Sequence, residues 1–467
     1  MLFSSVTFLY AFLPIVLILY FIAPKKLKNA VLLIASLFFY YYGERTYTVI
    51  LFVSSISDWV WSMLIEKYRG KKITKLFLAF SIIINLGLLG FFKYADFFIG
   101  NINAILGTSI PFTGVPLPIG ISFYTFQTMS YTIDVYRGNA KAQRNLVSFA
   151  TFVCLFPQLI AGPIVRYTDV AQELDSRKHS LEMFSNGVRR FAVGLGKKVI
   201  LADSMGALCK DLLSGGERSV LMYWLYVIAF SLQIYLDFSA YSDMAIGLGS
   251  IFGFRFPENF NYPFISKSIT EFWRRWHMTL GGWFRDYIYF PLGGSRTTTI
   301  KWLRNILIVW FVTGFWHGAA WNFVLWGLYF GVLLVIEKIF LSKLLEKTPA
   351  VIQHIYVLFT TLISFMIFSV ESMKDLPVFV GGMFGIGASG LCDARTLYVL
   401  DSFAILLAIC IVASTPGPKM LWKKISDTRA GQIAFTVLEP VMIVLLVVLS
   451  TALLVDGSFS PFLYFRF

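Results

Sequence analysis

Long apolar stretches recur along the whole chain and are separated by short polar segments. Many approach the ~20 residues that a helix needs to cross a bilayer, while others are shorter or broken by glycine. We interpret the following stretches as helices: Val6–Ile22, Ala30–Tyr42, Thr48–Ile65, Leu76–Phe92, Leu117–Ile133, Val147–Ala161, Val188–Leu201, Met222–Leu236, Met244–Phe256, Trp302–Gly314, Trp321–Ile339, Val351–Phe368, Leu397–Val412 and Phe435–Val455. The pattern predicts an all-α polytopic membrane protein with roughly 11 to 13 transmembrane or re-entrant helices.

Composition agrees with this pattern. Of 467 residues, 57% are apolar and only 14% are charged, against about 25% charged residues in a typical soluble domain. So few charges cannot cover the surface of a soluble chain of this length. An ordinary soluble enzyme, a disordered chain and a disulfide scaffold are therefore excluded, and the four cysteines are expected to be free thiols in helices.

The net charge of +14 comes from lysines and arginines in short segments between the apolar stretches. The basic segments are Lys25–Lys28, Glu66–Lys75, Arg137–Arg144, Lys267–Arg304, Leu341–Lys347 and Lys419–Arg429. They alternate with segments poor in lysine and arginine, such as the expected loop Tyr94–Pro116. We interpret the charge as a cytoplasmic bias and as contacts to anionic lipid, not as a nucleic-acid site. This places both termini outside and requires an even number of crossings.

His317 is the first candidate for chemistry. It lies between Gly314 and Gly318 inside the apolar region that runs from Trp302 to Ile339. An ionisable side chain at membrane depth is costly and is often functional, and a neutral imidazole suits a general base. The flanking glycines allow a backbone or a substrate to approach closely. A core histidine that hydrogen-bonds between helices would explain the residue equally well.

His277 is the second candidate, in a stretch from Glu271 to Asp286 that alternates aromatic and cationic side chains. An interfacial amphipathic helix would have the same composition. The functional alternative is a surface that binds a phosphate-bearing donor. The arginines that would pair with its phosphates are Arg274, Arg275, Arg285 and Arg296.

Other chemistry finds little support. His277, His317 and Asp286 match no metal-ligand spacing, so no metal site is expected. The chain lacks a phosphate-binding P-loop, a dinucleotide-binding glycine motif and a serine-hydrolase elbow. His179 and His354 are expected at the solvent or membrane interface. Asn322 and other polar residues in apolar stretches could orient His317 or a substrate, or form hydrogen bonds between helices.

Several motifs resemble those of the membrane-bound O-acyltransferase family, and more narrowly its bacterial alginate O-acetyltransferase branch. The motifs are Phe272-Trp-Arg-Arg-Trp-His277, Arg285-Asp-Tyr-Ile-Tyr-Phe-Pro-Leu-Gly-Gly294, Gly314-Phe-Trp-His-Gly-Ala-Ala-Trp321, and the blocks 116–127, 156–167 and 461–467. The likeness spans almost the whole chain. Gly281-Gly282 departs from the family pattern, and this pair predicts a loosened helix end near His277.

The resemblance implies one integral-membrane domain over residues 1–467, with helices around a central funnel, in the inner membrane of a bacterium. It implies His317 as the catalytic residue and His277 as a second histidine needed for activity. It further implies acetyl-CoA as the cytoplasmic donor, with no bound cofactor, and an extracytoplasmic polysaccharide as the final acceptor. A secreted or membrane-anchored partner of the SGNH-hydrolase type is expected to complete the transfer.

The mechanistic hypothesis assigns roles to these residues. His317 would remove the proton of the attacking hydroxyl, while His277 would hold or polarise the thioester or relay the proton. Trp316, Trp321 and Asn322 would line the passage. Two rivals stay open from the sequence: a transporter or flippase of a lipid-linked glycan, and a scaffold that anchors exopolysaccharide machinery.

Overall fold

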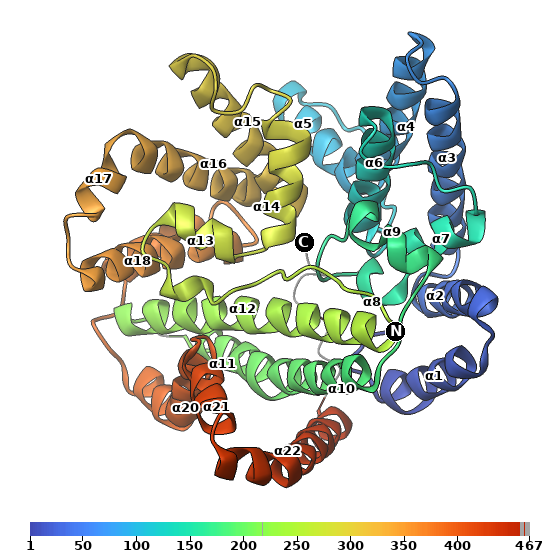
Figure 1. Cartoon of the computed structure of the whole chain (residues 1–467). Helices are drawn as coiled ribbons and strands as arrows, with labels where there is room; N and C mark the ends of the chain where they lie inside the picture. Colours follow the sequence, from blue (N-terminus) through green and yellow to red (C-terminus); the bar gives the residue numbers. More distant parts are fainter. Residues whose placement is uncertain (217, 458–461, 463–467) are drawn as a thin grey trace. The chain divides into compact units, whose positions relative to one another are not determined.

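The computed structural model describes residues 1–216, 218–457 and 462 (Figure 1). Across these residues the chain is helical and contains no strand, which confirms the all-α prediction. The block 461–467 lies outside the described residues except for Phe462. The described chain forms two compact units, residues 1–191 with 242–258 and residues 192–241 with 259–467.

The first unit contains the helices of the amino-terminal part of the chain. They are η1 (Phe8–Phe12), α1 (Leu13–Ile22), η2 (Lys25–Leu27), α2 (Lys28–Glu44), α3 (Tyr47–Lys67), α4 (Ile73–Leu89), η3 (Gly90–Tyr94), α5 (Ala95–Leu106), α6 (Ile121–Arg137), α7 (Leu146–Cys154), α8 (Phe156–Leu159) and α9 (Tyr167–Asp175). Helix α10 (Leu181–Gly196) begins in this unit, and α12 (Val220–Ile251) ends in it.

The second unit contains the remaining helices. They are η4 (Lys197–Ala202), α11 (Asp203–Leu213), η5 (Pro263–Ile265), α13 (Ile269–Arg275), α14 (Met278–Phe284), η6 (Arg285–Tyr289), α15 (Thr299–His317), α16 (Trp321–Ile336), η7 (Glu337–Leu341), α17 (Ser342–Leu345), α18 (Ala350–Ser369), α19 (Leu376–Met383), α20 (Ala394–Ala413), α21 (Gly417–Ser426) and α22 (Arg429–Asp456).

Seven helical segments of the described chain are long and apolar enough to cross a membrane, which makes the protein a multi-pass membrane protein. They are Tyr47–Lys67, Ile73–Leu106, Val220–Ile251, Trp321–Leu345, Ala350–Ser369, Ala394–Ala413 and Arg429–Asp456. The other apolar stretches form shorter or interrupted helices, so fewer segments meet this criterion than the 11 to 13 expected from the sequence.

Some helix boundaries differ from those expected. Met222–Leu236 and residues 244–251 belong to one continuous helix, α12, in which Asp237 pairs with Lys198 and does not break the helix. Residues 252–256, expected to be helical, follow the end of α12. Residues 95–106, expected in a loop, continue the preceding span as α5. Pro157 lies in a separate short helix, α8, so Val147–Ala161 is not one helix. Helix α14 runs through Gly281-Gly282, so the expected loosened end is wrong.

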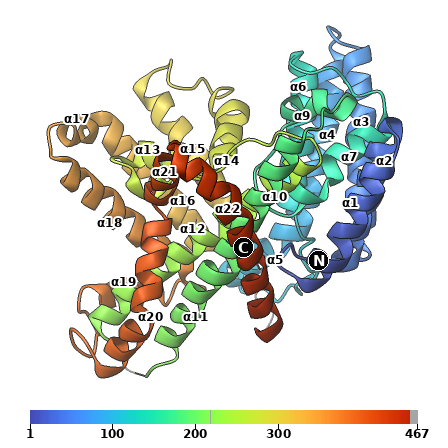
Figure 2. The same ribbon diagram turned by 60° about the horizontal axis from the view of Figure 1, so that its bottom comes forward.

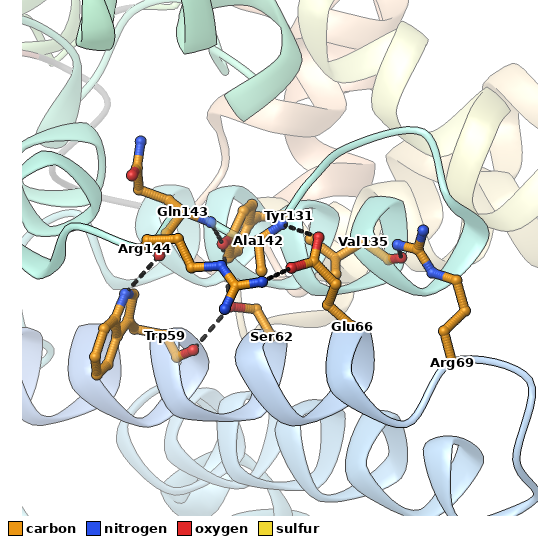
Figure 3. Close-up of polar contacts among 9 residues, drawn as sticks. All are labelled: Trp59, Ser62, Glu66, Arg69, Tyr131, Val135, Ala142, Gln143 and Arg144. Atoms are coloured by element: carbon orange, nitrogen blue, oxygen red, sulfur yellow. Dashed lines mark hydrogen bonds and ion pairs between the residues drawn. The ribbon is translucent and has the colours of Figure 1, made fainter.

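Polar contacts tie the first unit together. Buried Asp58 of α3 accepts hydrogen bonds from Ser81 Oγ (2.6 Å) and Asn85 Nδ2 (2.7 Å) of α4. The basic segment that follows α6, residues 137–144, contacts α3. Glu66 of α3 accepts a hydrogen bond from the backbone N–H of Ala142 and pairs with Arg144 at 2.7 Å (Figure 3). Such bonds replace water as the partner of polar groups between helices.

Helices α15 and α16 pack closely against each other in the second unit. A Cβ atom at Gly314 would overlap the carbonyl oxygen of Phe323, and one at Gly327 would overlap that of Trp310. Only glycine therefore allows the two backbones to pack this closely, as the sequence predicted for Gly314. Helix α22, red in Figure 2, packs little against the rest of the chain, because only 6% of its most apolar stretch is buried.

Candidate active site

His317 is the last residue of α15, and it is only 4% exposed. The chain leaves α15 through Gly318, bends at residues 319–320 and enters α16 at Trp321. A Cβ atom at Gly318 would overlap the ring of Phe323, so this connection between the two helices also requires glycine. The two glycines that flank His317 thus hold its ring where α15 and α16 meet.

Aromatic rings surround the imidazole of His317. Its ring centroid lies 5.1 Å from that of Trp316, 4.9 Å from that of Trp326 and 5.6 Å from that of Phe368. The amide of buried Asn322 donates hydrogen bonds to the carbonyls of Phe368 (3.3 Å) and Val370 (3.0 Å). Asn322 therefore fixes the end of α18 and, with it, one wall around His317.

His277 lies between α13 and α14 in a left-handed backbone conformation, with φ 42° and ψ 53°. Such a conformation is strained for a residue with a side chain and persists only where its surroundings fix it. On either side of His277, the backbone N–H of Trp276 donates to the carbonyl of Phe272 (2.8 Å) and that of Met278 to the carbonyl of Asn259 (2.9 Å). Buried Glu337 anchors the start of α13, because it accepts the backbone N–H groups of Ile269 and Thr270 and the Thr270 hydroxyl (2.7 Å). Ser268 also caps α13 through the backbone N–H of Glu271.

Buried Asn259 fixes the imidazole itself. Its Oδ1 lies 3.0 Å from His277 Nδ1 and accepts hydrogen bonds from the Thr279 hydroxyl (2.8 Å) and backbone N–H (3.4 Å). A backbone N–H can only donate, so this atom is the amide oxygen and His277 Nδ1 must donate to it. The second nitrogen, Nε2, then carries the lone pair, and it is buried with no hydrogen-bond partner in the described chain.

The surroundings of His277 favour the neutral form. Its side chain is 1% exposed, and its ring packs edge-on against Phe238 at a centroid distance of 4.7 Å. Burial lowers the pKa of His277 from 6.5 to about 3, because an apolar environment disfavours the imidazolium. His277 therefore presents a neutral, unprotonated Nε2 near pH 7.

Trp316 connects the two histidines. Its ring centroid lies 6.2 Å from that of His277 and 5.1 Å from that of His317. The two candidates, 40 positions apart in the sequence, therefore share one aromatic environment within the second unit, where Figure 1 shows α13 to α16 together. The structure brings together two buried imidazoles and no metal cluster is found in the described residues.

The four candidate arginines differ in what they contact. Arg275 pairs with Glu271 at 2.8 Å, and Arg285 pairs with its neighbour Asp286 at 2.8 Å. Arg274 and Arg296 are exposed. Donor binding by these four residues stays a prediction. Arg274 and Arg296 are the better candidates, because Arg275 and Arg285 are already paired with carboxylates.

The predicted passage residues also differ. Trp316 and Asn322 are buried around His317, whereas Trp321 is 53% exposed at the start of α16. Asn259 and Trp326 contact His277 and His317 directly, and neither was predicted from the sequence. Asn259 is separated from His277 by 18 positions, so no local spacing could have pointed to it.

Comparison with known proteins agrees with these motifs. The profile of the membrane-bound O-acyltransferase family matches residues 140–374, which include both histidines. The chain is 38% identical to "Probable alginate O-acetylase AlgI" of Azotobacter vinelandii over 100% of both chains. It is 32% identical to the peptidoglycan O-acetyltransferase of Helicobacter pylori, over 84% of this chain and 81% of that one.

A more distant match is the teichoic acid D-alanyltransferase of Bacillus subtilis, 31% identical over 48% of this chain and 59% of that one. These relatives are all named for the transfer or attachment of a small acyl group. The profile match and the full-length similarity confirm the resemblance seen in the motifs. The chain belongs to the membrane-bound O-acyltransferase family and is an O-acyltransferase.

Proposed function

We propose that this protein takes an acetyl group from acetyl-CoA on the cytoplasmic side and passes it across the membrane for O-acetylation of an extracytoplasmic polysaccharide. The observation that carries the proposal is the pair of buried histidines joined by Trp316. A scaffold or a flippase has no need for two imidazoles in one dry aromatic site, whereas acyl transfer needs a group that accepts and returns a proton.

The proposed chemistry balances with one proton carrier. The attacking hydroxyl oxygen forms a bond to the acetyl carbonyl carbon as His317 takes its proton. The C–S bond of the thioester then breaks, and His317 returns the proton to the departing CoA sulfur. The surrounding rings of Trp326 and Phe368 keep water from competing with the hydroxyl.

The tautomer of His277 narrows its role. A neutral imidazole that donates through Nδ1 has no N–H at Nε2 to offer to a thioester oxygen, so polarisation of the carbonyl is disfavoured. Nε2 can instead accept a hydrogen bond from a neighbouring hydroxyl of the sugar acceptor. This contact would orient the attacking hydroxyl, whose own proton goes to His317, toward the thioester. We therefore assign His277 to positioning the nucleophile and His317 to moving the proton.

The donor and acceptor sides of the proposal rest on charge and on relatives. Residues 267–304 carry seven Lys or Arg against two acids, and a basic segment is expected on the cytoplasmic side, where anionic CoA arrives. Relatives named for alginate and peptidoglycan O-acetylation support a polysaccharide acceptor. An SGNH-type partner at the outer face is part of the proposal, as is the inner membrane of a bacterium.

The test uses inverted membrane vesicles that contain the protein, so that its cytoplasmic face points outward. Acetyl-CoA labelled in the acetyl group is added to the surrounding medium. We expect free CoA outside and labelled polysaccharide inside, both lost in His317→Ala and both kept in His354→Gln, a matched histidine variant outside the site. A flippase would deliver glycan to the lumen without release of free CoA. A scaffold would leave polymer acetylation intact in the His317 variant.

A further inference from the structure

A pocket of about 410 Å³ opens in the first unit, between the end of α1 and the start of α10. Its walls are mostly apolar and include Phe21, His179, Leu181, Met183, Phe184 and Ile251. Leu181 is 90% exposed and Phe21 is 44% exposed, so the walls continue onto the surface. Apolar side chains exposed at the end of a hydrophobic helix indicate contact with lipid.

Cations gather at one side of this pocket. The Lys28 ammonium lies 4.4 Å from the ring centroid of Tyr20 and 5.3 Å from that of Phe21, which lines the pocket. The Arg177 guanidinium lies 4.5 Å from the ring centroid of Phe254 and donates to Asn29 Oδ1 at 2.7 Å. Aromatic faces hold both cations in place without neutralising them.

Among the described residues, no carboxylate neutralises these cations by direct contact. Neither Lys28 nor Arg177 forms an ion pair with any described residue, and Glu173 acts on Arg177 only from a longer distance. Arg177 Nη1 is buried and has no hydrogen-bond partner in the described chain. A buried guanidinium N–H without an acceptor is costly, so an added anion that binds between Lys28 and Arg177 would be stabilised.

His179 lines the pocket and also contacts Tyr20, whose ring lies beside Lys28. The Tyr20 hydroxyl donates its proton to the carbonyl of Phe252 (2.7 Å), so His179 Nε2 donates to the Tyr20 oxygen (2.9 Å) and its ring is fixed. The pKa of His179 is lowered by burial and then by the charges of Lys28, Arg177 and Lys25. The charges of Lys28, Arg177 and Lys25 make this wall of the pocket electropositive, which favours an anion.

We propose that this pocket binds an anionic phospholipid, with its phosphate between Lys28 and Arg177 and an acyl chain along Phe21, Phe184 and Ile251. An amphiphile fits both halves of the site, because the cations require a negative group and the apolar wall requires a hydrocarbon chain. A soluble anion would leave the apolar wall uncovered. This site lies wholly in the first unit and is independent of the proposed reaction.

The test uses the full chain, purified in detergent, stripped of lipid and mixed with phosphatidylglycerol or phosphatidylcholine. Retained lipid is counted by native mass spectrometry. We expect the protein to retain at least tenfold more phosphatidylglycerol than phosphatidylcholine, because each of the two cations contributes about 1 kcal/mol to binding of an anionic lipid. Lys28→Gln should lose about fivefold of this preference, while Lys28→Arg should keep it.

The controls separate this pocket from general surface charge and from soluble ligands. Within the described part of the chain, the Lys28 ammonium contacts only aromatic rings, so its replacement leaves no buried partner there unpaired. Lys423→Gln, an exposed lysine of α21, removes the same charge elsewhere and should retain the lipid preference. Equal retention of both lipids, an unaltered preference in Lys28→Gln, or displacement of phosphatidylglycerol by CoA or glycerol phosphate would each overturn the proposal.

Discussion

Asn259→Ala is the change that most sharply separates positioning of His277 from simple packing. It removes the oxygen that accepts hydrogen bonds from His277 Nδ1 and the Thr279 hydroxyl. A buried donor left without its acceptor costs about 1–3 kcal/mol. The variant therefore loses about this much of the free energy that favours the Nδ1–H tautomer of His277. If this restraint is needed at the transition state, kcat should fall roughly 5- to 150-fold.

The assay combines turnover with ¹⁵N spectra of histidine-labelled protein. The chain has only four histidines, so His277→Gln identifies the signal. We expect a single Nδ1–H tautomer in the native protein, a mixed or altered tautomer in Asn259→Ala, and recovery in Asn259→Asp, which keeps an oxygen acceptor. An Asn259→Ala protein with the native tautomer and the native kcat would refute the reasoning.

Further changes test the surrounding structure. Gly314→Ala places a Cβ against the Phe323 carbonyl, so we expect α15 and α16 to separate, with a lower melting temperature and at least tenfold less acetyl transfer. Glu337→Ala orphans the N–H groups that begin α13 and should cost about 2 kcal/mol or more in the free energy of unfolding, measured by denaturation. The folded protein binds a proton at His277 only near a pKa of about 3, whereas the unfolded chain does so near 6.5. The stability of the native protein should therefore fall as pH drops below about 6.5, and less so in His277→Gln.

Hydropathy predicted most helices because the need to satisfy backbone groups in the bilayer leaves few alternatives. It failed where a polar residue had a distant partner. Asp237 seemed to interrupt a span, yet Lys198 neutralises it inside the continuous helix α12. Pro157 had the opposite effect and ended a span that apolar content alone favoured.

The site was predictable only in part. The two histidines stand out because imidazoles are rare in so apolar a chain, and their motifs are those of the family. Their common environment depends on Trp316, whose ring could be placed beside both only by the fold. Asn259 carries no motif that marks it as the partner of His277, because a hydrogen bond across 18 positions depends on tertiary structure. The pairing of Arg285 with its neighbour Asp286 likewise depends on rotamers, which a sequence does not specify.

The central claim is that His317 carries the proton during acyl transfer, and single-turnover release of CoA measures this step directly. Purified protein in liposomes is mixed with acetyl-CoA and an acceptor alcohol, and free thiol is followed over time. We predict that His317→Ala, folded as judged by its melting temperature, slows thiol release by about 10²- to 10⁴-fold, while His354→Gln leaves the rate unchanged. Release at the native rate from the folded His317→Ala protein would contradict the account.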